Sequence, residues 1–324
     1  TINNPGDYKN LINNLNKNFG KTDLKFRKKM AVKSFYLTSQ YDLKISEWLG
    51  SSDKKNDSLK EKINLRYGEN PHQKSYLLKI NSKKTFYDNL IQGKELSYNN
   101  LRDSEVAFNC VNEFTEPTCV VTKHCSPCGV ASAKKISNAY LNAIKTDITS
   151  SFGGIIAINK KLDLETAILI SKNFYEVILA PSFDVKALKV LVKKKNLRVI
   201  KTKGLKNKKN MEIRTFNNGF LVQERNNINI NEKYISLASN YKASKEVIKD
   251  LIFSFKVSKY VGSNSIVLSK NLKTISIAGG QTSRIEATKN AVRKIKNSKT
   301  SYVAASDAFF PFTDSIKILN KNGC

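Results

Sequence analysis

Hydrophobic and polar positions follow two periods along the chain, one typical of helices and one of strands. In residues 1–50 apolar side chains recur at helical spacing from Tyr8 to Leu15 and again from Leu24 to Leu49, which predicts two helices. Further along, short runs rich in β-branched residues alternate with amphipathic stretches. This alternation is typical of a sheet with helices packed on it, so the predicted fold class is α/β.

The first alternating region predicts four strands and four helices. The predicted strands are a run that ends at Lys123, followed by residues 155–158, 177–180 and 198–200. The predicted helices are residues 103–114, 133–145, 164–174 and 185–193. A second unit starts near Met211. It predicts strands at 211–216, 219–223, 263–268, 274–278 and 302–305, a long helix from Ser244 to Tyr260 and a helix from Ile285. The second half looks like a loose echo of the first, although it is not a sequence repeat.

These patterns predict three parts. Residues 1–57 form a helical segment that ends in a polar linker at 50–58, residues 58–205 form a first α/β subdomain, and residues 206–324 form a second. The chain of 324 residues is long enough for such cores, and 40% of it is hydrophobic. No apolar run approaches the ~18 residues of a membrane helix. No signal-peptide pattern is visible, and five cysteines without a framework spacing suit a reducing cytoplasm.

The net charge of +29, from 56 Lys+Arg against 27 Asp+Glu, changes the range of possible partners. One interpretation is a basic nucleic-acid-binding protein, because such a surface attracts phosphate. The alternative is that lysine is spread over the whole surface by a compositional bias. Basic runs such as Lys193-Lys194-Lys195 are not interleaved with aromatic residues that could stack bases, which favours the second interpretation. A basic field also attracts small anionic substrates.

Candidate chemistry gathers at Lys123 and His124, directly after a buried strand. Pro127 and Gly129 are expected to break that strand, which frees both side chains to face one pocket at a strand end, where ligands collect in α/β folds. The chain has only two histidines, so candidates for a base near neutral pH are few. The alternative is a solvated surface pair without a catalytic role.

Cys125 and Cys128 form a C-x-x-C, which can indicate a redox or metal site. There is no second such pair, and neither histidine begins the H-x-E that a zinc deaminase needs. Buried or half-buried thiols are therefore the expected state, and no metal site is predicted.

Six motifs carry a family resemblance between residues 65 and 314. They are LRYGENPHQ, KHCSPCGVA, SSFGG, SNSIV, GGQTSRI and SDAFFPF. In this order they resemble the transformylase half of the bifunctional AICAR formyltransferase/IMP cyclohydrolase family. Residues 1–50 resemble the closing helices of the cyclohydrolase half. Because the family extends beyond both ends of this sequence, the resemblance implies a fragment whose second subdomain is truncated, with IMP cyclohydrolase activity expected only of an intact parent.

The resemblance implies two cytidine-deaminase-like α/β subdomains without the deaminase zinc, and a homodimer with active sites at the subunit interface. It implies transfer of a formyl group from 10-formyltetrahydrofolate to the 5-amino group of AICAR, giving FAICAR in IMP biosynthesis. No metal, nucleic acid or membrane is expected to take part.

The resemblance also implies roles for individual residues. Lys123 and His124 match the catalytic pair, and Asn264 is expected to add a hydrogen bond in catalysis. The remaining residues implied in AICAR binding are Arg66, Tyr67, Gly153, Glu176, Arg284 and Phe309. Ile285 and Asp314 match folate contacts. This sequence departs from common family patterns at Glu176, where Asp is familiar, at Ser126 in place of Asn, and at Thr313 in place of Arg.

Overall fold

The computed structural model describes residues 1–50, 60–80, 84–205, 211–240, 242–295 and 301–324. They belong to two compact units, one made of Thr1–Lys62 with Leu78–Asn81 and the other of Ile63–Leu77 with Ser82–Cys324. The predicted linker at 50–58 lies outside the described residues except for residue 50, and so does the predicted boundary at 57/58. The boundary at 205/206 borders a gap in the description, so the three-part division stays a prediction.

The first unit is helical, as predicted. A 3₁₀ turn at Pro5–Asp7 leads into α1 (Tyr8–Lys17), and α2 spans Leu24–Gly50. The Asp7 carboxylate joins the two helices through an ion pair with Lys33 at 2.6 Å. At the division between the units, β1 (Lys60–Asn64) pairs with β2 (Tyr76–Ile80) in a two-stranded sheet.

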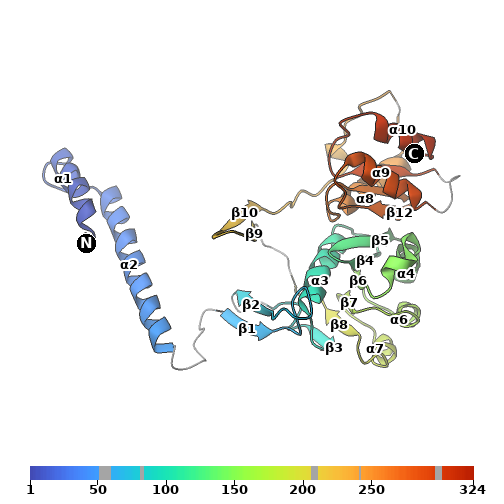
Figure 1. Ribbon diagram of the computed structural model, residues 1–324, viewed down its shortest axis with the longest axis horizontal. Helices are drawn as coiled ribbons and strands as arrows, with labels where there is room; N and C mark the ends of the chain where they lie inside the picture. Colours follow the sequence, from blue (N-terminus) through green and yellow to red (C-terminus); the bar gives the residue numbers. More distant parts are fainter. Residues whose placement is uncertain (51–59, 81–83, 206–210, 241, 296–300) are drawn as a thin grey trace. The chain divides into compact units, whose positions relative to one another are not determined.

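The second unit is built on one large mixed sheet, which confirms the predicted α/β class (Figure 1). Its described strands are β3 (Leu90–Gln92), β4 (Thr118–Lys123), β5 (Ser126–Ser132), β6 (Ile155–Ile158), β7 (Val177–Ala180), β8 (Arg198–Lys201), β11 (Ile266–Lys270), β12 (Lys273–Ala278) and β13 (Val303–Ser306). In space they are ordered β13-β11-β12-β5-β4-β6-β7-β8-β3. The pairs β6–β7 and β7–β8 are parallel, and the other neighbours are antiparallel.

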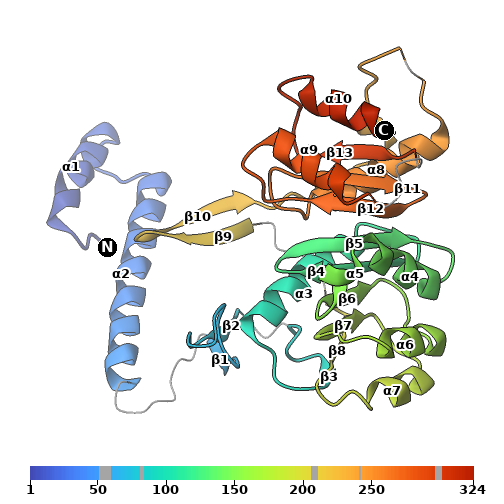
Figure 2. The ribbon, with the colours of Figure 1, turned by 45° about the vertical axis from the view of Figure 1, so that its right-hand side comes forward.

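Helices cover both faces of this sheet (Figure 2). They are α3 (Tyr98–Val111), α4 (Ile136–Thr146), α5 (Ile148–Ser151), α6 (Leu164–Ser171), α7 (Val185–Leu191), α8 (Lys245–Ser258), α9 (Arg284–Arg293) and α10 (Asp314–Lys321). One core packs α4, α6 and α7 on the sheet, a second packs α3 and α8 on the opposite face, and a third packs α9 and α10 on β11 and β12. Along β4, Cys119 and Val121 enter the first core and Val120 enters the second, as a strand buried on both faces requires.

A separate hairpin and a short turn complete the second unit. The hairpin joins β9 (Met211–Phe216) to β10 (Gly219–Glu224) in antiparallel register, and a 3₁₀ turn follows at Glu232–Tyr234. Among the described residues, no helix combines the length and the apolar character needed to cross a lipid bilayer.

The two halves share a structural repeat, in which one helix is followed by one β-hairpin. In the first half α3 precedes β4–β5, and in the second half α8 precedes β11–β12. Each hairpin turns through two residues with positive φ, His124 and Cys125 in one copy and Asn271 and Leu272 in the other. Each first strand has a register shift three residues before its turn. The second strands of the two copies, β5 and β12, then pair antiparallel, which joins the copies in one sheet.

The strand break expected at Pro127 and Gly129 was wrong. Pro127 and Gly129 do not break the strand, because the chain reverses at the preceding turn and both residues belong to β5. Pro127 is accommodated beside the β4 register shift, the kind of irregular position at which proline occurs within a sheet. Gly129 serves a different purpose, because a Cβ atom there would lie 2.0 Å from the carbonyl oxygen of Ala143 in α4. Glycine therefore allows α4 to pack directly on β5.

We predict that Gly129→Ala lowers the free energy of unfolding by about 1–3 kcal/mol or more, because the clash is with backbone and α4 must move away. The control is Gly219→Ala, where the nearest atom to the new Cβ is 3.8 Å away. Urea unfolding followed by circular dichroism measures both variants. Equal stability of the two would contradict the close packing of α4 on β5.

Candidate active site

The strand directions bring most of the predicted site residues to one edge of the sheet. β4 ends at Lys123 on this edge, and the antiparallel β6 begins there after Gly153. Because β7 and β8 run parallel to β6, Glu176 and Arg198 lie at their starts on the same edge. On the other side of β5, β11 starts at this edge, and β12 and β13 end there. We expected ligands at the carboxyl ends of strands, but β6, β7, β8 and β11 contribute their amino ends.

The catalytic candidates sit on a tight turn between β4 and β5. His124 and Cys125 have φ values of 53° and 57°, and Lys123 pairs with Ser126, so the turn is of the two-residue type that favours glycine or asparagine. Asp103 on α3 stabilises it, since its carboxylate accepts hydrogen bonds from the backbone N–H of His124 at 3.2 Å and of Cys125 at 2.6 Å. The imidazole of His124 remains exposed.

Lys123 is tied to the neighbouring loop. Its Nζ donates a hydrogen bond of 2.8 Å to the carbonyl oxygen of Phe152. Gly153 follows with a φ of 71°, a conformation that glycine adopts without strain, and its N–H donates to the carbonyl oxygen of Phe174. An ammonium group has three donors, so two of those on Lys123 are left for a ligand.

A second group surrounds Glu176. Its carboxylate forms an ion pair of 2.7 Å with Arg198, whose side chain is only 3% exposed. Burial lowers the pKa of Arg198, and the negative charge of Glu176 acts to raise it. The positive charge of Arg66 also lowers the pKa of Arg198, so Arg66 lies near this ion pair. The Arg66 guanidinium lies 5.0 Å from the centre of the Tyr67 ring. The structure thus brings Arg66, Tyr67 and Glu176 together.

A third group forms on the other side of β5. The Asn264 side chain donates to the carbonyl oxygen of Gln281 at 3.0 Å. Arg284 is buried and pairs with Asp307, and it also donates to the carbonyl oxygen of Ser265 at 3.2 Å. Burial acts to raise the pKa of Asp307, but hydrogen bonds from Ser263, Ser265 and Arg284 outweigh it and hold this pKa at about 2. An ionised Asp307 therefore fixes the loop that carries Asn264.

The remaining predicted residues are placed less closely. Ile285 is half-buried beside Arg284 at the start of α9. Phe309 is 81% exposed, and Asp314 is exposed at the first position of α10. Among the described residues, no hydrogen bond, ion pair or ring contact joins these three to Lys123 or His124.

Three residues that position the site were not identified from the sequence. They are Asp103, Arg198 and Asp307. Arg198 left a visible signal, because it is a charged residue that opens an apolar strand. Asp307 lies inside the SDAFFPF motif without having been given a role. Asp103 lies 21 residues before His124 in the first turn, and Asp250 lies 21 residues before Asn271 in the second turn. Only a comparison of the two halves could have shown this shared spacing.

The cysteine pair shows no sign of activation. Burial raises the pKa of the Cys128 thiol to about 12, and the charge of Asp147 adds to the effect. Burial also raises the pKa of Cys125 to about 11, with Asp103 adding to it. Both thiols are therefore protonated at neutral pH, and thiolate is the reactive form. Within the described residues, no group of three or more His, Cys, Asp and Glu side chains is placed to hold a metal ion.

Comparison with known proteins shows which family this sequence matches. A family model described as "AICARFT/IMPCHase bienzyme" matches residues 1–294. The chain is 42% identical to the bifunctional purine biosynthesis protein PurH of Fusobacterium nucleatum, covering 98% of this chain and 64% of the relative. It is 44% identical to PurH of Clostridium kluyveri, covering 96% and 62%, and 43% identical to PurH of Buchnera aphidicola, covering 96% and 63%. The chain thus spans less than two thirds of the length of these relatives.

We predict that Asp103→Ala lowers the free energy of unfolding by about 1–3 kcal/mol, because two backbone N–H groups lose a charged acceptor. Adding Cys125→Gly should restore part of the loss, since glycine adopts the left-handed turn without strain. Asp250→Ala, with Asn271→Gly as its rescue at the exposed residue of that turn, is the matched pair in the second copy. Chemical unfolding of the four variants measures this, and the role of the carboxylates is refuted if either Ala variant matches the unaltered protein.

Proposed function

Because the chain belongs to the AICARFT/IMPCHase bienzyme family, we propose that it carries the formyl-transfer activity of the bifunctional enzyme. In this proposal the formyl group of 10-formyltetrahydrofolate moves to the 5-amino group of AICAR and gives FAICAR, in purine biosynthesis. The observation that carries the proposal is the convergence of Lys123, His124 and the groups around Glu176 and Asn264 on one sheet edge. The intact parent's IMP cyclohydrolase activity is part of the same proposal.

The proposed chemistry needs a base and a cation. The AICAR amine is conjugated with its ring and is a poor nucleophile, so it must lose a proton as it attacks the formyl carbon. His124 is exposed on a fixed turn and is the proposed base. Attack places negative charge on the formyl oxygen, and Lys123, with two donors still available, is proposed to stabilise it. The bond from the formyl carbon to N10 then breaks, and N10 receives the proton.

The other residues are proposed to hold the substrates. Arg66, Tyr67, Gly153 and Glu176 surround the start of the parallel strands and are assigned to AICAR. Asn264 has a second amide hydrogen beyond the one that bonds Gln281, which it can donate to the reacting groups. Arg284 is assigned to AICAR through Nη2, which bonds no described residue, because Nη1 serves Asp307 and Ser265. Phe309 is assigned to AICAR, and Ile285 and Asp314 to the folate, by family resemblance.

Further family properties are proposed with the activity. Two cytidine-deaminase-like subdomains without zinc are supported by the helix–hairpin repeat, in which Asp103 and Asp250 hold equivalent turns. A homodimer is supported by the β9–β10 hairpin, whose apolar side chains, Ile213, Phe216, Phe220, Leu221 and Val222 among them, are exposed. A cytoplasmic location is supported by five unpaired cysteines.

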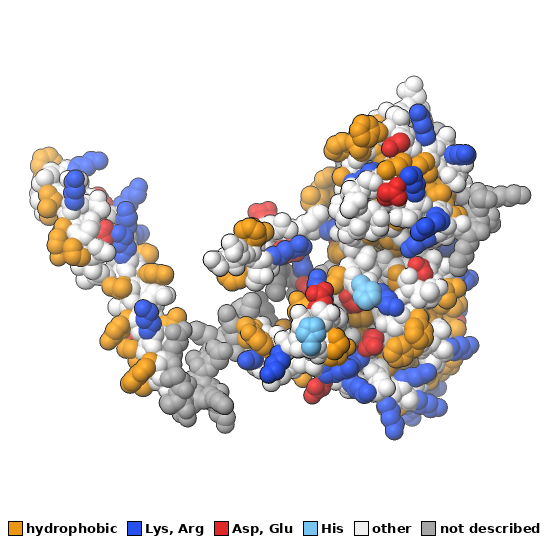
Figure 3. All heavy atoms as spheres, viewed as in Figure 1, with side chains coloured by type: hydrophobic (Ala, Val, Ile, Leu, Met, Phe, Trp, Pro, Cys, Tyr) orange, Lys and Arg blue, Asp and Glu red, His pale blue; other side chains and the backbone are white. Residues whose placement is uncertain are grey.

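The competing proposal, nucleic-acid binding, needs a continuous basic surface. On the face of the second unit that Figure 3 draws, lysine and arginine side chains are scattered among neutral and acidic ones and do not form one stripe. This distribution favours attraction of small anionic substrates over a nucleic-acid track.

We predict that His124→Ala, made in the product of the complete open reading frame, lowers kcat by about 10²–10⁴, the usual contribution of a general base. Lys123→Met should also lower kcat, and the two losses should not add in full because both residues act on one transition state. AICAR affinity should change much less, since Arg66 and Asn264 remain. The assay is formyl transfer at saturating substrates, with AICAR affinity measured by calorimetry.

The matched control is His72→Ala, which removes the only other histidine and should leave kcat near normal. Near-normal kcat in a folded His124→Ala protein would end the proposed role. A salt-sensitive shift of DNA or RNA, without folate-dependent activity in the unaltered protein, would favour the competing proposal.

A further inference from the structure

A buried ionic cluster joins the two halves on the face of the sheet that α3 and α8 cover. The Glu113 carboxylate, just after α3, accepts a hydrogen bond of 2.7 Å from Lys259 and one of 2.6 Å from the Tyr260 hydroxyl. Both donors lie just after α8. Lys256, in the last turn of α8, also donates to the backbone carbonyl oxygen of Glu113 at 3.0 Å. None of these groups has a part in the proposed reaction so far.

This cluster is costly to bury. The side chains of Glu113 and Lys259 are only 13% and 16% exposed. Removing two charges from water costs free energy that their attraction only partly returns, and apolar residues of similar size often stabilise a core as well. Burial raises the pKa of Tyr260 and the hydrogen bond to Glu113 raises it further, so the hydroxyl keeps its proton and remains a donor. A fixed geometry therefore explains the cluster better than stability does.

Glu113 and Tyr260 hold equivalent positions in the two copies of the helix–hairpin repeat. Glu113 lies ten residues after Asp103, and Tyr260 lies ten residues after Asp250. Because the copies point in opposite directions, equivalent residues meet near the axis that relates them. The segment after Tyr260 leads to the start of β11, at the edge of the proposed site, and carries Asn264.

The strand pairing between the halves lies away from the proposed site. β5 and β12 pair through Ala131 and Lys273, near the opposite edge of the sheet. Among the described residues, the hydrogen bonds that join residues 259–265 to the first half all end on Glu113. This carboxylate therefore helps to set the position of the segment relative to the half that carries His124.

The cluster also lies beside the reaction centre. One cavity of about 1460 Å³ is lined by Glu113, Tyr260 and Gly262 together with Cys125, the residue that follows His124. The cluster thus faces the space between the loops that carry the proposed reacting groups.

Little slack separates Tyr260 from Asn264. The carbonyl oxygen of Gly262 accepts a hydrogen bond of 2.7 Å from the N–H of Gly280. A Cβ atom at Gly279 would lie 2.9 Å from the same carbonyl oxygen, so glycine lets the chain after β12 pack closely on this segment. Because the segment is short and closely packed, a shift at its first residue is passed on to its last.

We propose that Glu113 and Tyr260 are positioning residues for Asn264, which hold its loop at the spacing from His124 that formyl transfer needs. The inference rests on the proposed function, since Asn264 is assigned there to donate a hydrogen bond to the reacting groups. Neither positioning residue touches a substrate in this proposal. Their effect should therefore appear in kcat and should pass through Asn264.

The test is Tyr260→Phe in the product of the complete open reading frame, which removes one hydroxyl and keeps the ring. kcat for formyl transfer should fall about threefold to thirtyfold, because a small displacement of a group that acts on the transition state lowers the rate steeply. AICAR affinity, measured by calorimetry, should change little, since Arg66 and Tyr67 lie in the first half. Glu113→Ala should lower kcat at least as far. Glu113→Gln, which keeps an acceptor oxygen, should retain most of it.

A double mutant separates positioning from general destabilisation. In the Asn264→Ala protein, Tyr260→Phe should lower kcat no further, because its effect passes through the missing amide. The matched control is Tyr302→Phe, which removes another buried tyrosine hydroxyl of the second half, bonded to the carbonyl oxygen of Leu319 at 3.4 Å, and should keep kcat. An equal loss of kcat in both backgrounds overturns the inference. So does the same loss in Tyr302→Phe, or an unchanged kcat in a folded Tyr260→Phe protein.

Hydrogen exchange distinguishes failure of the inference from failure of the proposed function, because it needs no activity. Peptides that contain residues 263–265 should exchange faster in Tyr260→Phe than in the unaltered protein, and Tyr302→Phe should leave them unchanged. If these peptides do not respond to Tyr260→Phe, the inference falls even though transfer occurs. If the unaltered protein transfers no formyl group, the proposed function fails, and the exchange result still decides whether Glu113 holds the loop.

Discussion

The site depends on a carboxylate that holds a strained turn. Two consecutive residues other than glycine with positive φ are costly, and His124 and Cys125 adopt that conformation because Asp103 accepts hydrogen bonds from both of their backbone N–H groups. The same arrangement recurs where Asp250 binds the N–H groups of Asn271 and Leu272, at 2.8 and 2.7 Å. In one copy the turn carries an exposed imidazole, and in the other it carries no titratable group. The fold thus repeats a rigid turn, and we propose that one copy of it is used for chemistry.

The way the two copies join explains why the site draws on both. β5 and β12 pair antiparallel, with Lys273 opposite Ala131, and the Thr274 hydroxyl bonds the backbone of Val130 at 2.9 and 3.0 Å. Because β5 and β12 run antiparallel, the two copies point in opposite directions. The turn between β4 and β5 therefore lies at the same edge of the sheet as the start of β11. His124 therefore shares an edge with Asn264, although 140 residues separate them in the sequence. A continuous sheet keeps these loops at a fixed spacing.

The sequence predicted much of the fold because apolar periodicity reports local structure. The helices at 1–50, the strands at 155–158 and 177–180 and the hairpin that begins at Met211 all formed where their patterns indicated. β5 was missed because Pro127 and Gly129 are signals of a break, and only the packing of α4 and the β4 register shift make them compatible with a strand.

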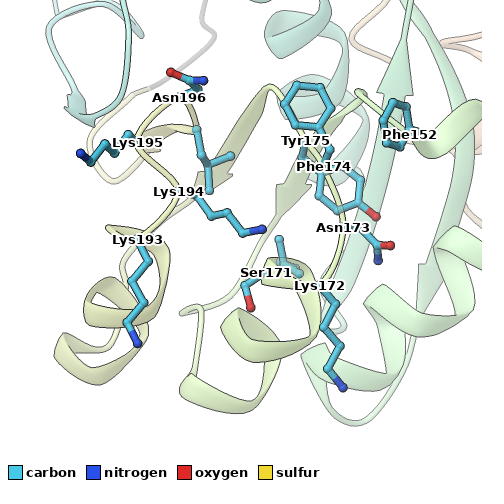
Figure 4. Close-up of a pocket in the computed structure, with 12 residues that line it drawn as sticks. Phe152, Ser171, Lys172, Asn173, Phe174, Tyr175, Lys193, Lys194, Lys195 and Asn196 are labelled. Carbon is cyan, nitrogen blue, oxygen red and sulfur yellow. The ribbon is translucent and has the colours of Figure 1, made fainter.

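The residues of the candidate site were predicted mainly through motifs, and reasoning from residue types and spacing pointed chiefly to Lys123 and His124. Asp103, Arg198 and Asp307 act through hydrogen bonds across long sequence separations, which no local pattern encodes. A pocket lined by Lys172, Lys193, Lys194 and Lys195 (Figure 4) likewise combines residues more than twenty positions apart, so the run at 193–195 alone could not reveal it.

We propose that one sheet edge, built from both copies, forms a single AICAR site. Hydrogen exchange followed by mass spectrometry tests this directly, because bound ligand slows the exchange of amides that it covers or rigidifies. With saturating AICAR, peptides that contain Gly153 and peptides that contain Asn264 should both exchange more slowly, while peptides that contain Asn271, at the opposite edge, should not change. Protection confined to one of the first two regions, or found at Asn271 instead, would contradict the account.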